Sequence, residues 1–152
     1  MNPMELDREI DRPRLAAWRA FLVAHARIVE AIERDLAEAG SLPLSWYEVL
    51  IALGEAPDRR LRMHELADAV LLSPSGLSRL VDRLEARGLL ERQPCSEDRR
   101  CQFAVLTETG LDALRRAWPT YTAGIAGHFG ERLSDAEVET LRETLNRLVA
   151  DH

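Results

Sequence analysis

Arginine is the residue type in this sequence that is best suited to binding an anion. All twenty basic side chains are arginine, and lysine is absent. A guanidinium group pairs with a phosphate or with the edge of a guanine base through two parallel hydrogen bonds, whereas an ammonium group acts as a point charge. The codon usage of a GC-rich genome is the simpler explanation of the composition itself. The placement of the arginines must therefore decide whether they bind an anion.

The charge is distributed unevenly along the chain, which has a formal net charge of −6. Between residues 58 and 100 there are nine arginines and eight acidic residues, which gives a net charge of +1. The rest of the chain has eleven arginines and eighteen acidic residues, a net charge of −7. The middle third is therefore the less acidic part, and it is where a nucleic acid would be expected to bind.

Metal and enzyme chemistry find no support in the sequence. The four histidines are scattered, and no two stand four residues apart with a carboxylate, as a zinc site would require. We find no glycine-rich phosphate loop, nucleophile elbow or pair of carboxylates typical of hydrolases. We therefore expect no metal, no cofactor and no enzymatic activity.

Two cysteines, Cys95 and Cys101, flank a polar turn and are the only ones in the chain. We expect two unrelated thiols. The alternative is a redox pair, because the neighbouring Arg92, Arg99 and Arg100 would favour a reactive thiolate. A bridge would require the two Cα atoms to lie roughly 4.4–6.8 Å apart, which directly opposed residues of a hairpin approach.

The length of 152 residues and the hydrophobic content of 46% fit one globular domain. No apolar run is long enough for a transmembrane helix, and the acidic N-terminus lacks the apolar core of a signal peptide. We therefore expect a cytoplasmic protein that does not enter a membrane.

Hydrophobic periodicity and capping signals predict a mostly helical chain with one β-hairpin. A capping box, Ser45 with Glu48, is expected to begin the second helix, and Ser134 with Glu137 the last one. Residues 55–60 are expected to form a loop, and Pro119 is expected to kink its helix. The predicted helices are residues 13–39, 45–53, 63–70, 73–87, 107 onward and 134 onward; the predicted strands are 89–95 and 101–106.

The order of helix, short helix, helix and hairpin is that of a winged helix-turn-helix, and the middle of the chain resembles the MarR family of bacterial transcription regulators. The resemblance covers about residues 12–150, and residues 75–110 are its specific part. It rests on Leu66-Ala67-Asp68-Ala69-Val70, on Ser75 to Glu85, on Gly88-Leu89-Leu90-Glu91-Arg92, on Asp98-Arg99-Arg100 and on Leu106-Thr107-Glu108 with Gly110.

The resemblance implies a winged helix-turn-helix lobe over residues 44–106, flanked by dimerisation helices over residues 12–40 and 108–150. Residues 1–152 would form one MarR-like chain. A homodimer would read two half-sites of a double-stranded DNA operator about one helical turn apart. The apolar rows of the first and last helices, led by Leu22, Val29, Leu141 and Leu145, would form the dimer core.

The residues expected to contact DNA lie on the helix that enters the major groove and on the hairpin, called the wing. Short polar side chains let a helix approach the base edges, and the helix start favours a phosphate. In the family, Asp98 would brace Arg100 for entry into the minor groove, and Arg99 would lie beside the phosphate backbone. The start of the helix, Pro74-Ser75-Gly76, differs from that of many relatives, so no base preference is carried over. The predicted DNA-binding residues are Ser73, Ser75, Ser78, Arg79, Arg83, Arg99 and Arg100.

Four aromatic or titratable residues are candidates for a small-molecule pocket: Trp18, His25, Trp46 and Tyr47. The family's effector site lies between the dimer helices and the DNA-binding lobe, and these side chains would suit an aromatic effector. Tryptophans are otherwise core or interface anchors, and a histidine on an apolar stripe is otherwise a packed one.

The leading hypothesis is thus a dimeric DNA-binding repressor that a small molecule releases. Two alternatives remain at this point. One is a thiol-based redox switch through Cys95 and Cys101, and the other is a winged-helix dimer that binds protein partners without DNA.

Overall fold

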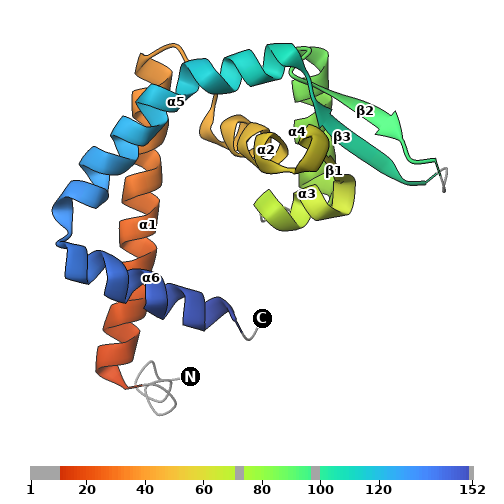
Figure 1. Cartoon of the computed structure of the whole chain (residues 1–152). Coiled ribbons are helices and arrows are strands. Elements are labelled where there is room, and N and C mark those ends of the chain that lie inside the picture. The colour runs from red at the N-terminus through yellow and green to blue at the C-terminus, as the bar shows by residue number, and fades with distance from the viewer. Residues whose placement is uncertain (1–10, 71–73, 97–99, 151–152) are drawn as a thin grey trace, which may run out of the picture. The chain divides into compact units, whose positions relative to one another are not determined.

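The computed structural model describes residues 11–70, 74–96 and 100–150 of the chain (Figure 1). Its internal contacts divide the chain into two units, Asp35–Ala123 and Met1–Arg34 together with Gly124–His152. We call the first the winged unit and the second the helical unit. Each has its own architecture, and each is described separately.

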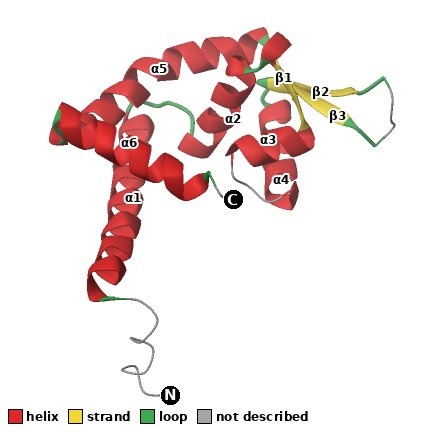
Figure 2. Ribbon diagram, turned by 60° about the horizontal axis from the view of Figure 1, so that its bottom comes forward, coloured by secondary structure: helices red, strands yellow, loops and turns green. Residues whose placement is uncertain are grey.

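The winged unit is built around a small antiparallel sheet with helices packed against it (Figure 2). The sheet has the strand order β1-β3-β2, in which Leu90 pairs with Leu106 and Arg62 pairs with Phe103. The elements that lie wholly within this unit are α2 (Leu44–Glu55), η2 (Pro57–Arg59), β1 (Arg60–Arg62), α3 (Met63–Val70), α4 (Pro74–Ala86), β2 (Leu90–Pro94) and β3 (Gln102–Leu106). This confirms the predicted winged helix-turn-helix.

Helix α4 shows why this sequence folds as it does. Leu77, Leu80, Val81 and Leu84 recur every three or four residues, and all four are buried in the core of the winged unit. The helix ends where Gly88 adopts a φ of +71°, a left-handed conformation that favours glycine. The leucine-rich stripe therefore fixes which face of α4 points inward, and the polar face is left outside.

Two local predictions were wrong. Residues 60–62 form strand β1, which pairs with β3 far along the chain, although the sequence predicted a loop up to Arg60. Helix α2 begins at Leu44 with Pro43 as its N-cap and without a side-chain cap, so Ser45 and Glu48 do not form the expected capping box. Pro43 occupies the N-cap position, so Ser45 is the second residue of the helix and cannot cap it.

The start of α5 (Glu108–His128) is joined closely to the turn before β2. The Thr107 hydroxyl donates to the Gly88 carbonyl at 2.6 Å, and it accepts from the Gly110 N–H at 3.0 Å. The Thr107 N–H donates to the Leu89 carbonyl at 3.2 Å. Gly110 lies so close to Leu89 that an added Cβ would be 1.9 Å from the Leu89 oxygen. The wing and α5 therefore meet at a junction that only glycine fits.

The helical unit contains most of α1 (Arg12–Glu38), the end of α5, the short η3 (Gly130–Arg132) and α6 (Asp135–Val149). The capping box at the start of α6 is confirmed. The Ser134 hydroxyl accepts from the Glu137 N–H, while the Glu137 carboxylate accepts from the Ser134 N–H at 2.8 Å. The Ser134 N–H and the Ser134 hydroxyl, which both donate to this carboxylate, lower the pKa of Glu137. Helix α5 continues through Pro119.

Within the part of the chain that the structure describes, no helix is both long and apolar enough to cross a membrane.

Candidate nucleic-acid interface

The outward face of α4 carries the predicted DNA-contacting side chains. Ser75, Ser78, Arg79 and Arg83 are all exposed, opposite the buried leucine stripe. Among the described residues, the Arg79 and Arg83 guanidinium groups make no ion pair, so neither is held by a carboxylate of its own chain. Two short hydroxyl side chains and two arginines on one exposed helix face can approach base edges and phosphates.

The structure adds a residue that the sequence analysis did not select. Arg92 on β2 is only 18% exposed, and its guanidinium group contacts Asp82 at 2.7 Å and Glu85 at 3.0 Å, both on α4. It also donates to the Ser78 carbonyl at 3.3 Å, and the Glu85 carboxylate accepts from the Arg92 N–H at 2.8 Å. Arg92 thereby ties the wing to α4, and it sets the position of one relative to the other.

A signal for Arg92 was present in the sequence. Strand residues alternate between two faces, so Arg92 lies on the same side of β2 as the buried Leu90. An arginine on the inward face of a strand needs carboxylate partners. Asp82 and Glu85 stand one helical turn apart on the preceding helix, and they supply those carboxylates.

The wing is described in part. Arg100 is exposed at the start of the segment that leads into β3. Ser73, Asp98 and Arg99 lie outside the described residues, so the predicted brace between Asp98 and Arg100 stays a prediction. Of the seven predicted DNA-binding residues, five are described, and all five are exposed in the winged unit.

The two cysteines correct the expectation of unrelated thiols. Cys95 and Cys101 form a disulfide bond with Cα atoms 5.3 Å apart. Cys95 follows Pro94 and Cys101 precedes Gln102, which form the last pair of the two strands, and the Cys95 N–H donates to the Cys101 carbonyl at 3.1 Å. The hairpin register therefore places the two residues opposite each other, which is the geometry a bridge requires.

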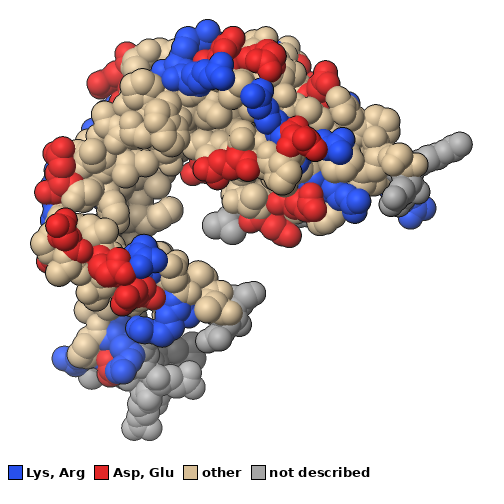
Figure 3. All heavy atoms as spheres, in the orientation of Figure 1, with Lys and Arg blue, Asp and Glu red and all other residues tan. Residues whose placement is uncertain are grey.

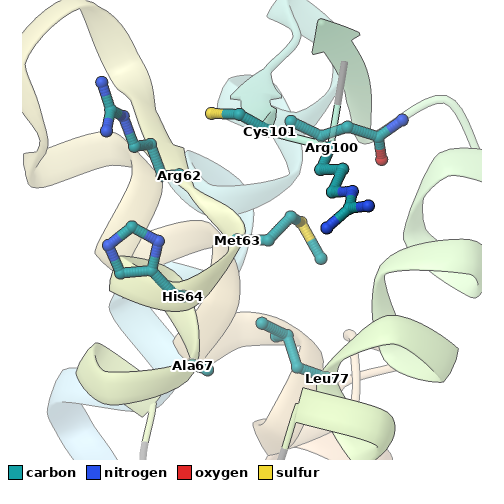
Figure 4. A pocket seen from close by; sticks show the side chains of 8 residues that line it. Arg62, Met63, His64, Ala67, Leu77, Arg100 and Cys101 are labelled. Carbon is teal, nitrogen blue, oxygen red and sulfur yellow. The ribbon is translucent and has the colours of Figure 1, made fainter. Parts of the chain in front are cut away.

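A cavity of about 490 Å³ lies between the wing and the start of α3 (Figure 4). Arg62 and His64 line it from the side of β1 and α3, and Arg100 and Cys101 line it from the wing. Met63, Ala67 and Leu77 form its apolar part. Arg62 and His64 were not among the predicted residues. The alternation in Arg60-Leu61-Arg62 was the available signal, because it places Leu61 inward and both arginines outward.

In the view of Figure 3, the arginine and the acidic side chains are interspersed, without a broad patch of one sign. Among the described residues, no group of three histidine, cysteine or acidic side chains could hold a metal ion. On the face shown in Figure 3, an anion would meet separate arginines rather than a broad basic patch.

The four candidate effector residues belong to different units. Trp46 and Tyr47 lie in the winged unit, where the Arg87 guanidinium group stands 5.6 Å from the Trp46 ring. Trp18 and His25 lie in the helical unit, and both stack near Phe21, with ring centroids 6.1 and 6.5 Å away. His25 also lines an apolar cavity of about 650 Å³.

Tyr47 is the most unusual of the four. Its side chain is fully buried against Tyr121, with ring centroids 4.7 Å apart, and its hydroxyl has no hydrogen-bond partner among the described residues. Burial, and secondly the neighbouring Tyr121, raises the pKa of Tyr47 to about 12. A buried hydroxyl without a partner costs stability, so it marks a place where a further polar group would be favoured.

Comparison with known proteins places this architecture. The MarR family sequence model matches residues 41–100, from just before α2 to Arg100 of the wing. The chain is 34% identical to the crystal structure of Sco3205, a MarR family transcriptional regulator from Streptomyces coelicolor in complex with DNA. That likeness covers 93% of this chain and 89% of Sco3205, with a TM-score of 0.85.

The chain belongs to the MarR family. It is a transcriptional regulator rather than an enzyme, because the members of this family and the relatives found are transcriptional regulators.

Two further relatives of this MarR family protein extend the comparison. The HTH-type transcriptional regulator MhqR of Bacillus subtilis (strain 168) is 34% identical over 101 residues, which are 66% of this chain and 66% of MhqR. CouR from Rhodococcus jostii RHA1, solved bound to p-coumaroyl-CoA, is 27% identical, with a TM-score of 0.74 and coverage of 93% of this chain and 94% of CouR. The likeness thus extends well beyond residues 41–100, which the family model matches.

Proposed function

We propose that this MarR family regulator binds a specific operator as a homodimer, acts as a repressor, and is released by a small-molecule effector. The observation that carries the proposal is the exposed face of α4, where Ser75, Ser78, Arg79 and Arg83 are presented while Arg92 fixes the adjoining wing. Sco3205, a relative of the same architecture, was solved on DNA, which supports the same use of this face.

In this proposal, α4 lies in the major groove and the wing lies beside it. Arg79 and Arg83 have no carboxylate partner among the described residues, so they do not exchange an existing ion pair for a DNA contact. Arg100 would reach the minor groove, braced by Asp98, and Arg99 and Ser73 would contact the backbone, as the family resemblance implies. Phosphate contacts then set the register, and base contacts set the specificity.

The homodimer is supported by the helical unit. Among its described hydrophobic residues only Ile32 is buried, and Trp18, Phe21, Leu22 and Val23 are 45–59% exposed. Val29, Leu141 and Leu145 line the apolar cavity of about 650 Å³. A second copy of the chain would cover such surfaces, and a twofold dimer would place two α4 helices on half-sites about 10 bp apart.

An effector is supported by the buried Tyr47 hydroxyl, which has no partner among the described residues, and by CouR, a relative that binds an aromatic acyl thioester. The proposed ligand has an aromatic ring and a polar group that pairs with Tyr47. Trp46, Trp18 and His25 stay candidates for the same role.

The test begins with a duplex enriched from a random-sequence pool by the wild-type protein. Arg79→Ala and Arg100→Ala should each weaken binding by about 1–3 kcal/mol, with unchanged thermal unfolding because both side chains are exposed. Arg115→Ala on α5, an exposed arginine paired with Asp112, is the matched control and should bind as wild type does. Unchanged affinity of both test variants across several salt concentrations, or no enriched duplex at all, would contradict the proposal.

A further inference from the structure

Two arginines share one aromatic ring on the outer face of the sheet. Arg60 and Arg62 point to the same side of β1, because strand residues two positions apart do so, and Arg62 pairs with Phe103 of β3. The guanidinium carbon of Arg60 lies 4.6 Å from the centroid of the Phe103 ring, and that of Arg62 lies 5.8 Å from it. A ring at this distance restrains a guanidinium group through a cation–π contact and leaves the N–H groups at its edge available. Phe103 therefore positions both arginines.

The two arginines differ in whether they reach the cavity of about 490 Å³ (Figure 4). Arg62 lines it together with His64 and Arg100, whereas Arg60 is not among the lining residues. None of the described residues that line the cavity is acidic. The nearby Glu65 carboxylate accepts from the backbone N–H of Arg62 at 2.8 Å and is not part of the lining. The cavity thus presents basic side chains to a molecule that enters it.

The donors of Arg62 and His64 are available to an anion. Both side chains are exposed, and among the described residues neither of them forms an ion pair. A guanidinium group carries five N–H donors, and an imidazole ring carries at least one in either protonation state. Donors of this kind bind the oxygen atoms of a phosphate. An oxyanion in the cavity would not have to displace a carboxylate from either residue.

The position of the cavity indicates which oxyanion it meets. Leu77 of α4 lines one side, and Arg100 and Gln102 line the side of the wing. The cavity thus lies between the two elements that are proposed to contact DNA. A duplex that contacts both of them must cross the gap between them, and it carries its backbone phosphates to this place.

We propose that Arg62 and His64 hold a backbone phosphate of the operator in this cavity, with Phe103 as the residue that positions Arg62. The proposal rests on the proposed operator binding, and it adds a third contact, from β1 and the start of α3, to those of α4 and the wing. Backbone phosphates are the same in every sequence. The contact therefore adds affinity and fixes the register of the protein on DNA without selecting bases.

The decisive test compares Arg62→Ala with Arg60→Ala in the full chain. Both variants remove one exposed positive charge from the same face of β1 and one contact to Phe103, but only Arg62 lines the cavity. Fluorescence anisotropy measures affinity for a duplex selected by wild type from a random-sequence pool and for an unselected duplex of the same length, each over a series of potassium chloride concentrations. Arg62→Ala should weaken binding to both duplexes by about tenfold. It should also reduce the slope of log affinity against log salt by about 0.9, whereas Arg60→Ala should match wild type.

Two further residues test the details of the site. His64→Ala should weaken binding to both duplexes by about threefold, because it removes one uncharged or charged donor. Phe103→Leu should also cost about threefold, whereas Phe103→Tyr keeps the ring and should bind as wild type does. In the double variant with Arg62→Ala, Phe103→Leu should cause no further loss. A further loss there would remove the positioning role of Phe103.

Free phosphate could enter the same cavity in place of a phosphate of DNA, and thermal unfolding separates the two sources. Wild type and Arg62→Ala are unfolded in potassium phosphate and in potassium chloride of the same ionic strength. A phosphate-specific stabilisation that Arg62→Ala removes, together with unchanged duplex affinity of that variant, would assign the cavity to a free oxyanion and overturn the proposal. Lower duplex affinity of Arg62→Ala supports DNA as the source whether or not free phosphate also binds.

The remaining outcomes separate this proposal from the one on which it rests. Equal losses in Arg60→Ala and Arg62→Ala would show an effect of net charge and overturn the contact in the cavity. A loss in Arg62→Ala that is confined to the selected duplex would make Arg62 a reader of bases and overturn the phosphate assignment. If no duplex is enriched, operator binding itself fails. If Arg79→Ala weakens binding to the selected duplex and Arg62→Ala does not, operator binding stands and only the phosphate site is wrong.

Discussion

The two units of the molecule differ in how far they bury their apolar side chains. In the winged unit, leucines and valines of α2, α3, α4 and the sheet bury one another within a single chain. In the helical unit, Ile32 is the one buried hydrophobic residue among those described, and Phe21, Leu148 and Val149 are 45–67% exposed. The winged unit therefore has a core of its own, whereas the helical unit leaves large apolar side chains exposed in the single chain. Stability that depends on a second copy varies with protein concentration.

The largest expected effect comes from a charge placed on the uncovered face. Phe21 lines the 650 Å³ cavity and is 45% exposed in the single chain, so Phe21→Glu should not disturb the chain itself. If a second copy covers this face, the buried carboxylate should weaken the dimer by about 4 kcal/mol. Analytical ultracentrifugation should then show monomers at micromolar concentration, and operator binding should be lost.

Val23→Glu is the matched control for this variant. Val23 is 59% exposed and lies two residues away, on the opposite side of α1 from the cavity. It should leave the dimer intact. A dimer that tolerates Phe21→Glu as well as Val23→Glu would remove the difference between the two units.

A core truncation in the winged unit should act within one chain. Leu84 is fully buried on α4, and Leu84→Ala should lower the free energy of unfolding by about 3 kcal/mol through lost burial and the cavity left behind. Chemical denaturation followed by circular dichroism measures this loss. The loss should be the same at low and at high protein concentration, and a loss that depends on concentration would show that this core is not stable within a single chain.

The tie between wing and α4 should have a smaller effect on folding. Arg92→Ala removes contacts to Asp82 and Glu85, both of which are partly exposed, so we expect a loss of about 1 kcal/mol in unfolding free energy. Operator affinity should fall as well, because α4 and the wing are no longer held together. Arg115→Ala, which breaks an exposed pair on α5, should change neither quantity. Loss of stability without loss of affinity would limit Arg92 to a structural role.

The smallest effect concerns the pH dependence of the winged unit. Burial raises the pKa of Tyr47 from 10.0 to about 12 in the folded chain. Its contribution to stability is thus fully present below pH 10, and it is lost as the pH rises towards 12. Unfolding free energies measured across this range should decline less in Tyr47→Phe than in wild type. An equal decline would mean that other groups cause the alkaline loss.

Tyr47→Phe has a second expected effect, on stability at neutral pH. At neutral pH it removes a buried hydroxyl that has no partner among the described residues, so it should leave stability unchanged or raise it slightly.

The sequence was a good guide where a signal is local and repeated. The stripe from Leu77 to Leu84, the left-handed Gly88 and the capping box at Ser134 each depend on residues within one or two turns, and the structure contains all three. The outward placement of Arg79 and Arg83 follows from the same periodicity. Once α4 is placed, its exposed face is determined.

The features that were missed depend on contacts between distant residues. Strand β1 has three residues and pairs with a strand about forty positions later, so its short alternation could not by itself identify it as a strand. The partners of Arg92 lie on another element, and the disulfide depends on the exact register of the hairpin. At Ser45 a local rule failed, because Pro43 starts the helix two residues earlier than the capping motif suggests.

The close approach of Gly110 to Leu89 bears on which sequences this fold accepts. Any other residue there would place its Cβ 1.9 Å from a backbone oxygen and 2.7 Å from the Leu106 side chain, and a backbone carbonyl cannot move aside as a flexible side chain can. Gly40 offers a contrast, since it has a φ of +65° and no atom within 4 Å of an added Cβ. In a saturation library selected for function, position 110 should tolerate no replacement, whereas position 40 should accept asparagine, which adopts left-handed conformations more readily than other residues. Substitution is thus blocked where the start of α5 packs against the Leu89 backbone, although the same type of residue elsewhere in the chain is open to replacement.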